Sequence, residues 1–288
     1  MNQSDCRLVS LVTLKLTCSL LWIVIGLNAS LAQAANLSVT DVLTSPGKPI
    51  QLQARLTNPE AEGEIGLPDQ PLEFIVHGRT VGRANTDEKG WARLDFAPSM
   101  RGNLPIIVKV VTPSKVDAIE GEGVLLSWER RRPILLIDLA VLVEGELVTD
   151  PPPPELYKDP GLRLGDAHPA AAAELSKLAE FYYNLVYLDL TGQGHLEDIQ
   201  DWVREHQFPP GMIRIIPKTP TALTELIQDL KKEGWEKVSG GIGRTADFAE
   251  VLVQNRLQTV ILPLPQTKGG FPRRAIVLSD WSRVRRHL

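Results

Sequence analysis

The hydrophobic pattern of the chain changes at a basic run, Arg130-Arg131-Arg132-Pro133, and this change constrains the fold more than any other feature. Before the run, segments such as residues 50–56 and 91–96 alternate apolar and polar side chains, as half-buried strands do. After it, residues 134–137 are continuously apolar, as in a strand buried on both faces, and stretches with helical spacing follow. We therefore expect two domains of different class. We interpret the basic run as a solvated linker between them.

Residues 36–129 read as an antiparallel β-sandwich of immunoglobulin-like type. Turn signals recur between about seven short strand candidates, and no helical period is present. Residues 86–96 resemble the T-D-x-x-G-x-A segment of bacterial immunoglobulin-like modules, which we interpret as a hairpin turn with inward apolar positions. Such a module implies either adhesion or a spacer and folding partner. No aromatic or charged cluster stands out, which favours the spacer.

Residues 130–288 predict an α/β domain with a Rossmann-like parallel sheet. Apolar strand candidates alternate with helical stretches, a pattern typical of a parallel sheet covered by helices on both faces. The predicted strands are residues 134–137, 185–188, 212–216, 237–239, 259–262 and 275–278, and the predicted helices are residues 170–183, 196–206, 221–232 and 246–256.

Residues 1–34 read as a cleavable secretion signal. Arg7 and Lys15 precede an apolar run, residues 16–27, which is shorter than the roughly 20 residues that span a bilayer. Ala32-Gln33-Ala34 then supplies the small-x-small pattern of a cleavage site. We expect an exported protein, periplasmic or extracellular, that is not an integral membrane protein after cleavage. An uncleaved anchor over residues 8–31 is the alternative.

Cysteine and charge content exclude several function classes for the mature chain. Both cysteines, Cys6 and Cys18, lie in the predicted signal, so the mature chain has no disulfide, thiolate nucleophile or cysteine-based zinc site. The formal net charge of the whole chain is −4. This mild acidity argues against nucleic acid as a partner.

Several polar residues follow the predicted strands of the second domain. Asp138 ends the first strand, Thr191 and Gly192 follow the second just after Asp189, and Lys218 follows the third. Residues 240–247, Gly-Gly-Ile-Gly-Arg-Thr-Ala-Asp, follow the fourth and end in Asp247. Because ligands of open parallel sheets bind beyond the carboxyl ends of the strands, these residues predict a site at one edge.

Three stretches of this domain resemble the haloacid dehalogenase superfamily, and within it the lipin-type phosphatidate-phosphatase domains. Residues 133–145 (PILLIDLAVLVEG) resemble the strand that carries the nucleophile. Residues 186–211 (VYLDLTGQGHLEDIQDWVREHQFPPG) are similar to the family's strand, hydroxyl loop and T-R-x-W-L-x-x-H-x-F-P-x-G helix. Residues 240–254 (GGIGRTADFAEVLVQ) resemble its G-F-G-N-R-x-T-D-x-x-A-Y segment.

The resemblance implies a role for each candidate residue. Asp138 matches the nucleophile, which also binds Mg²⁺, and Asp247 matches a second metal ligand. Thr191, Gly192 and Lys218 match the phosphate-binding groups, with Thr191 and Lys218 also counted as catalytic. A carboxylate nucleophile forms an aspartyl-phosphate, while Mg²⁺ and a lysine offset the charge of the transferring group.

The chain departs from the family at two positions that carry chemistry. The family's acid–base Asp, two residues after the nucleophile, is Ala140 here, and Gly243 runs straight into Arg244 where the family has an Asp or Asn. General acid–base help contributes roughly 10²–10⁴-fold, so its loss predicts a poor phosphatase. Asp189 and Glu197 are possible replacement acids, although Asp189 lies within the predicted strand. The proline run 151–154 is interpreted as part of a loop over an open site.

Three functions therefore stand as hypotheses. The first is a degenerate phosphatase-like protein with a binding or structural role. The second is an active Mg²⁺-dependent phosphomonoester hydrolase that acts on lipid or surface phosphate esters. The third is a cell-surface adhesive or scaffold protein that acts through the sandwich.

Overall fold

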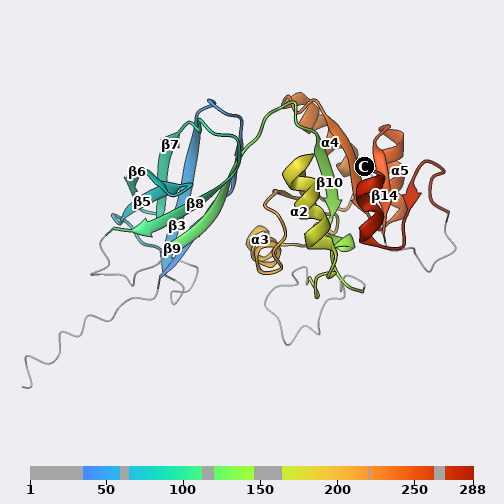
Figure 1. The fold of residues 1–288 in the computed structure, drawn as a ribbon. Coiled ribbons are helices and arrows are strands. Elements are labelled where there is room, and N and C mark those ends of the chain that lie inside the picture. The colour runs from blue at the N-terminus through green and yellow to red at the C-terminus, as the bar shows by residue number, and fades with distance from the viewer. Residues whose placement is uncertain (1–34, 59–64, 112–119, 146–163, 220, 263–269) are drawn as a thin grey trace, which may run out of the picture.

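The computed structural model describes residues 35–58, 65–111, 120–145, 164–219, 221–262 and 270–288. The predicted signal and the proline run 151–154 lie outside these residues. The described chain forms a strand-rich N-terminal domain and a C-terminal α/β domain, which lie side by side (Figure 1). The class of structure changes near residue 130, from strands alone to strands alternating with helices.

The N-terminal domain is a β-sandwich of the immunoglobulin-like kind. One sheet contains β1 (Asn36–Val39), β3 (Ile50–Asn58), β4 (Ile65–Gly66) and β7 (Trp91–Phe96). The other has the order β2 (Val42–Thr44), β9 (Glu120–Ser127), β8 (Gly102–Val110), β5 (Pro71–Val76), β6 (Arg79–Asn85). Inward side chains of β3, β5 and β8, among them Leu52, Phe74 and Ile106, form its core. The period-two alternation predicted the strands because one face of each sheet is buried.

Two local features of the sandwich differ from the prediction. The strand β2 pairs with β9 in parallel, so the sandwich is not wholly antiparallel. The chain switches sheets at Asp41, whose Oδ1 accepts the Val124 N–H of β9 at 2.7 Å. Residues 86–90 do not close a hairpin either, because β6 and β7 belong to different sheets. Asp87 instead holds a turn between the sheets, with its Oδ1 accepting the N–H groups of Lys89 and Trp91 at 2.9 Å.

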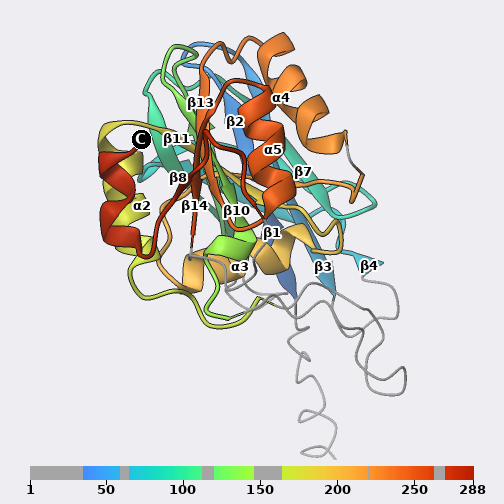
Figure 2. The same cartoon turned by 90° about the vertical axis from the view of Figure 1, so that its right-hand side faces the viewer.

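The C-terminal domain is a six-stranded parallel sheet with helices on both faces, as predicted (Figure 2). Its order is β12-β11-β10-β13-β14-β15, so the chain reverses direction across the sheet between β10 and β13. The strands are β10 (Ile134–Asp138), β11 (Asn184–Asp189), β12 (Met212–Ile215), β13 (Val238–Gly243), β14 (Gln258–Ile261) and β15 (Ile276–Val277). The helices are α2 (Ala171–Phe181), α3 (Leu196–Glu205), α4 (Ala222–Lys232) and α5 (Ala246–Gln254), with 3₁₀ turns η1 (Leu139–Val141) and η2 (Trp281–Arg286).

The central strand β10 explains why its sequence is continuously apolar. Leu135 and Ile137 pack into one core with α2, α3 and η2. Ile134 and Leu136 point to the other face and pack with α4 and α5. A strand covered on both faces has no exposed positions, so the period-two pattern disappears. None of the helices in the described ranges is long and apolar enough to cross a membrane.

The sandwich shares a core with the α/β domain. Leu126, near the end of β9, and Trp128, which directly follows β9, are buried among residues of β10, β11 and α4. The Trp128 ring meets Trp235 edge to face, with centroids 5.9 Å apart, and its Nε1–H donates to Oδ1 of Asn103 at 2.8 Å. Farther along the interface, the Gln200 side chain of α3 donates to Oδ2 of Asp41 at 2.7 Å.

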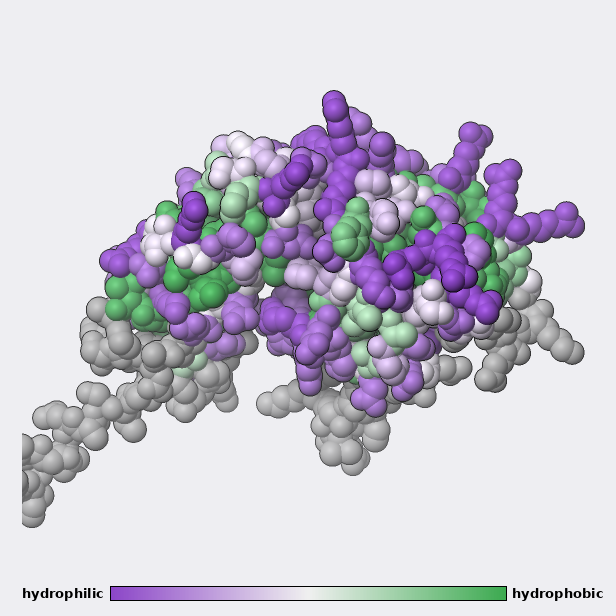
Figure 3. All heavy atoms as spheres, in the orientation of Figure 1, coloured by the Kyte–Doolittle hydropathy of each residue, from purple (hydrophilic) through white to green (hydrophobic). Residues whose placement is uncertain are grey.

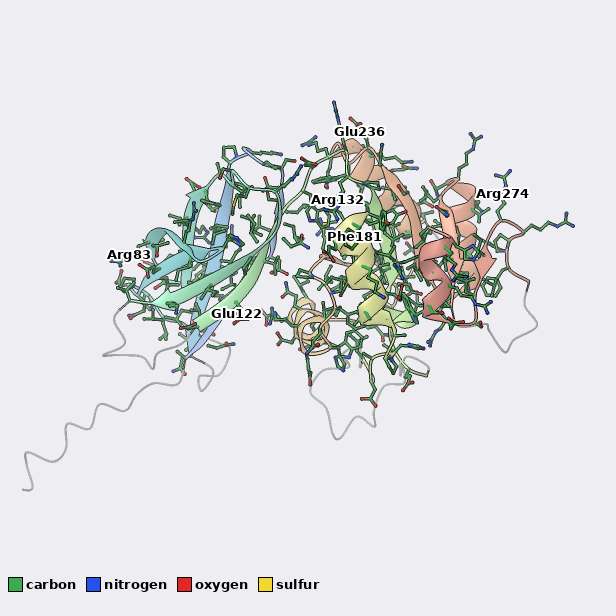
Figure 4. The ribbon with its side chains drawn as sticks, viewed as in Figure 1. Arg83, Glu122, Arg132, Phe181, Glu236 and Arg274 are labelled. Atoms are coloured by element: carbon green, nitrogen blue, oxygen red, sulfur yellow. The ribbon has the colours of Figure 1, made fainter. Side chains whose placement is uncertain are left out.

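The basic run 130–132 is more than the solvated linker that the sequence predicted. The Arg130 guanidinium lies over the Trp235 ring, 5.9 Å from its centroid. Arg132 donates to the carbonyls of Ala179 and Glu180 at the end of α2, next to Phe181 (Figure 4). Two of the three arginines therefore hold the start of β10 against neighbouring elements, while Arg131 is exposed.

Candidate functional site

Asp138 ends the central strand β10 at the point where the chain reverses across the sheet. Its neighbours on either side are β11 and β13. The residue is 2 % exposed. Its Oδ1 accepts the N–H of Ala140 at 3.0 Å, and its Oδ2 accepts the N–H of Arg244 at 3.4 Å. The position is the one at which open parallel sheets bind ligands, but both carboxylate oxygens already have backbone donors.

Burial raises the pKa of Asp138 from 3.8 to about 6. The N–H groups of Ala140 and Arg244 and the Arg244 guanidinium oppose this rise in pKa, whereas the nearby Asp189 adds to it. Desolvation disfavours the charged form of any carboxyl, and hydrogen bonds to that form restore part of its stability. The Asp138 carboxyl is therefore largely ionised at pH 7 and largely protonated at pH 5.

Asp189, at the end of β11, organises the loop that follows it. It is 1 % exposed. Its Oδ1 accepts the backbone N–H and the hydroxyl of Thr191, at 2.8 and 2.6 Å, and its Oδ2 accepts the N–H of Gly194 at 2.8 Å. The Thr191 hydroxyl in turn accepts the N–H of Gln193 at 3.2 Å. The Thr191 hydroxyl, which was predicted to hold phosphate, and Asp189, a possible replacement acid, therefore form hydrogen bonds within the loop itself.

Gly192 and Lys218 lie close together, as the sequence predicted for residues at one sheet edge. Gly192 adopts a positive φ of 68°, and a Cβ there would lie 3.0 Å from the Ile216 carbonyl oxygen and 3.4 Å from the backbone nitrogen of Lys218. The loop after β11 therefore packs on the backbone that follows β12. Lys218 itself is exposed, and it is not among the groups that set the pKa of Asp138.

Asp247 lies on the first turn of α5 and is exposed. The N-cap of this helix is Thr245, whose hydroxyl accepts the Phe248 N–H at 3.2 Å. The glycine stretch before it serves packing, since a Cβ on Gly241 would lie 2.8 Å from Cζ of Phe248 and 2.6 Å from Cδ2 of Leu252. Small residues here let α5 approach β13 closely.

Arg244 is the site residue that the sequence reasoning missed. Its Nη2 donates to the carbonyl of Val143 at 2.9 Å, and its Nη1 donates to the carbonyl of Gly145. Together with its own N–H, these contacts tie the end of β13 to Asp138 and to the segment that leaves β10. The signal was available, because a cation directly after a strand next to β10 must lie at the same edge.

Mg²⁺ in proteins is usually held by one or two carboxylates together with waters and phosphate oxygens, and the two candidate carboxylates here are Asp138 and Asp247. Within the described ranges, His, Cys, Asp and Glu side chains form no group of three or more that could hold a metal ion. Asp138 is buried with both oxygens hydrogen-bonded, whereas Asp247 is exposed. A cleft of about 350 Å³ between β1 and α3 is lined by none of the candidate residues.

No protein-family profile and no curated protein matches this sequence. Among solved structures, the fibronectin(III)-like modules of CbhA from Clostridium thermocellum match 33 % of this chain and 47 % of their own, at 14 % identity and a TM-score of 0.25. The match to the D0-D1 domain of Intimin covers 32 % of this chain and 47 % of that chain, with 13 % sequence identity and a TM-score of 0.23. The match to a sialyltransferase from Photobacterium damsela covers 78 % of this chain and 42 % of that chain, with 10 % sequence identity and a TM-score of 0.20. Such values are too low to indicate function.

Proposed function

We propose that the chain is an exported, haloacid dehalogenase-like protein with a degenerate phosphatase site, which has a binding or structural role and weak or no hydrolysis. The observation that carries the proposal is the contact between Ala140 and Asp138. The Ala140 N–H donates to Oδ1 of Asp138 at 3.0 Å, so residue 140 lies directly beside the carboxylate. Its side chain is a methyl group where the resembled family has its acid–base Asp.

The strand order supports the relationship to that family. Asp138 ends the central strand of a parallel sheet, where the chain reverses direction, as expected of a Rossmann-like domain. The three stretches that resemble the family supply β10, the β11–α3 unit and the β13–α5 unit. These units adjoin one another around β10.

The chemistry of ester cleavage explains why Ala140 matters. When a carboxylate attacks phosphorus, an acyl phosphate forms and the bond to the leaving oxygen breaks, so that oxygen needs a proton. A positioned acid contributes roughly 10²–10⁴-fold to such a step. Asp189 is buried nearby, but Thr191 and Gly194 occupy its oxygens. Slow or absent turnover is therefore the expected state of the site.

One observation favours the second function, an active phosphatase acting on lipid or surface phosphate esters. The pKa of Asp138 is about 6, so the carboxylate is in its nucleophilic, ionised form at neutral pH. A dependence on Mg²⁺ would rest on two carboxylates, the buried Asp138 and the exposed Asp247.

Phosphate release from an aryl phosphate, with and without Mg²⁺, separates the two functions. We expect the protein from Ala35 onward to show little turnover, and Ala140→Asp to raise it by one or more orders of magnitude. Ala140→Asn, of nearly the same size but without a proton to give, is the matched control. Wild-type turnover that is lost in Asp138→Asn would establish the active phosphatase instead.

A further inference from the structure

Positive charge is concentrated at the C-terminal end of the sequence. Residues 251–288 contain seven Lys and Arg and a single acidic residue, Asp280. The whole chain has 31 Lys and Arg against 35 Asp and Glu, so all the remaining residues together are strongly acidic. A charge asymmetry of this kind points to an anionic partner for the basic part.

Four of these arginines form an exposed surface that we call the basic edge. It consists of Arg256, Arg273, Arg274 and Arg286. By contrast, Arg283 and Arg285 have acidic partners, Asp280 and Glu174. None of the four basic-edge side chains has a hydrogen bond or ion pair with another residue of the described chain. Unpartnered arginines gathered at one place leave a local positive field that the protein does not neutralise.

The fold brings the basic edge together from separate segments. Arg256 follows α5 and Arg274 precedes β15, and both line a cavity of about 420 Å³ with Val253, Leu257 and Gln258. The Gln258 side chain donates to the carbonyl of His287, so the backbone next to Arg286 lies at the start of β14. Arg274 points outward at the end of the molecule farthest from the sandwich (Figure 4). Hydrophilic side chains project from the surface there (Figure 3).

The basic edge is separate from the candidate site. Arg256 and Arg274 come before β14 and β15, so they lie at the amino ends of the parallel strands. Asp138 and Thr191 follow their strands and lie at the carboxyl ends. Charge changes at the basic edge can therefore be made without touching the site.

We propose that the basic edge docks the protein on a bilayer surface that carries anionic lipids. The large apolar side chains that are exposed in the described chain, among them Ile65, Phe181 and Tyr182, all lie elsewhere. A protein partner would be expected to meet an apolar or aromatic centre, and a single-stranded nucleic acid an aromatic stacking platform. Arginines whose described neighbours include no such anchor suit the diffuse charge of lipid head groups.

Arg256 offers a test that separates charge from folding. It stands just past the end of α5 with a φ of 58°, a left-handed conformation that glycine adopts more readily. Arg256→Gly is therefore expected to keep or improve the fold while it removes one charge of the basic edge. Arg274→Gln removes a second charge from an exposed position.

The experiment is sedimentation of the protein from Ala35 onward with vesicles of phosphatidylcholine, alone or with 30 % phosphatidylglycerol. We expect binding to the anionic vesicles only, weakened by 0.5 M NaCl, and about five-fold weaker for each arginine removed in Arg256→Gly and Arg274→Gln. The matched control is Lys48→Gln with Arg79→Gln, which removes two exposed charges from the sandwich and is expected to leave binding unchanged.

Three results of the vesicle experiment would overturn the proposal. They are equal binding to neutral and anionic vesicles, anionic binding that the Arg256→Gly and Arg274→Gln variants retain in full, and loss of binding to the same extent in the sandwich control. Preferential capture of an acidic polypeptide such as polyglutamate over the anionic vesicles would assign the basic edge to a protein partner and would also overturn it.

Discussion

The backbone N–H of Arg244 lies 3.4 Å from Oδ2 of Asp138, and the Arg244 guanidinium is the positive charge that lowers the pKa of this buried carboxyl. The same guanidinium holds the carbonyls of Val143 and Gly145. One residue thus links β13, the buried carboxyl and the segment that leaves β10. In the resembled family a lysine after the third strand is assigned the charge-balancing role, and here that position is the exposed Lys218.

We expect Arg244→Gln to raise the pKa of Asp138 above about 6, because the nearby positive charge is lost. The pKa can be measured by NMR titration of the carboxyl carbon. Faster exchange of the Glu144 amide, which donates to the Asp166 carbonyl, should accompany it. Lys218→Gln is the control and should leave both unchanged. A shift of the Asp138 pKa in the Lys218 variant and none in the Arg244 variant would reverse this assignment.

The raised pKa of Asp138 makes the stability of the protein depend on pH. The pKa of this carboxyl is 3.8 in the unfolded chain and about 6 in the fold, so the folded state binds the proton more tightly. At pH 3 and below the carboxyl is largely protonated in both states and carries no penalty. As pH rises from about 4 to 6, the unfolded state ionises first and stability falls. Above that range the penalty is constant, about 3 kcal/mol.

Asp138→Asn removes this penalty, so we expect it to unfold at higher urea concentration than the wild type at pH 7. The two should converge as pH falls toward 4. Asp247→Asn is the control, since this exposed residue on the first turn of α5 should change stability by under about 1 kcal/mol. A difference between Asp138→Asn and the wild type that stayed constant from pH 4 to 8 would contradict the assignment.

The glycine stretch before α5 allows a test of whether its small residues serve packing or ligand binding. A Cβ on Gly241 would lie 2.6 Å from Leu252 Cδ2 and 2.9 Å from the Leu136 carbonyl oxygen. Because α5 would have to move off β13, we expect Gly241→Ala to cost about 1–3 kcal/mol in the free energy of unfolding. Gly270→Ala, where a Cβ meets nothing within 4 Å, should be nearly neutral. A neutral Gly241→Ala would contradict the packing role.

The sequence predicted those parts of the structure that depend on periodicity. Alternation located the sandwich strands, and unbroken apolar runs such as residues 134–137 located strands covered on both faces. The approach of Gly192 to the backbone at Lys218 followed from the parallel topology. Periodicity does not encode where a loop side chain finds its partner, however. It therefore could not show that the Thr191 hydroxyl is bonded to Asp189.

The contacts between the domains could not be predicted from the sequence, for a related reason. A buried Trp128 fits the end of a sandwich strand as well as it fits the core of the next domain. Only the path of the chain around residues 128–134 decides between them. The switch of β2 to the second sheet likewise depends on Asp41 reaching the Val124 N–H, a contact between residues far apart in sequence.

Trp128 provides the test of whether the two domains unfold together. It is 2 % exposed, packs against Trp235, and donates to Asn103. Trp128→Ala should lower the free energy of unfolding by about 3–5 kcal/mol, since it leaves a large cavity. Because the side chain belongs to the core of the α/β domain, we expect the urea midpoint of that domain to fall as well as that of the sandwich. Far-UV circular dichroism follows the urea unfolding of the chain, and hydrogen exchange of the β10 amides follows the α/β domain.

Trp91→Ala is the control, because Trp91 is a half-buried tryptophan of the sandwich flanked by Arg55 and Arg93, and it should leave β10 exchange unchanged. If Trp128→Ala weakened the sandwich alone, the domains would be independent units joined only by the chain.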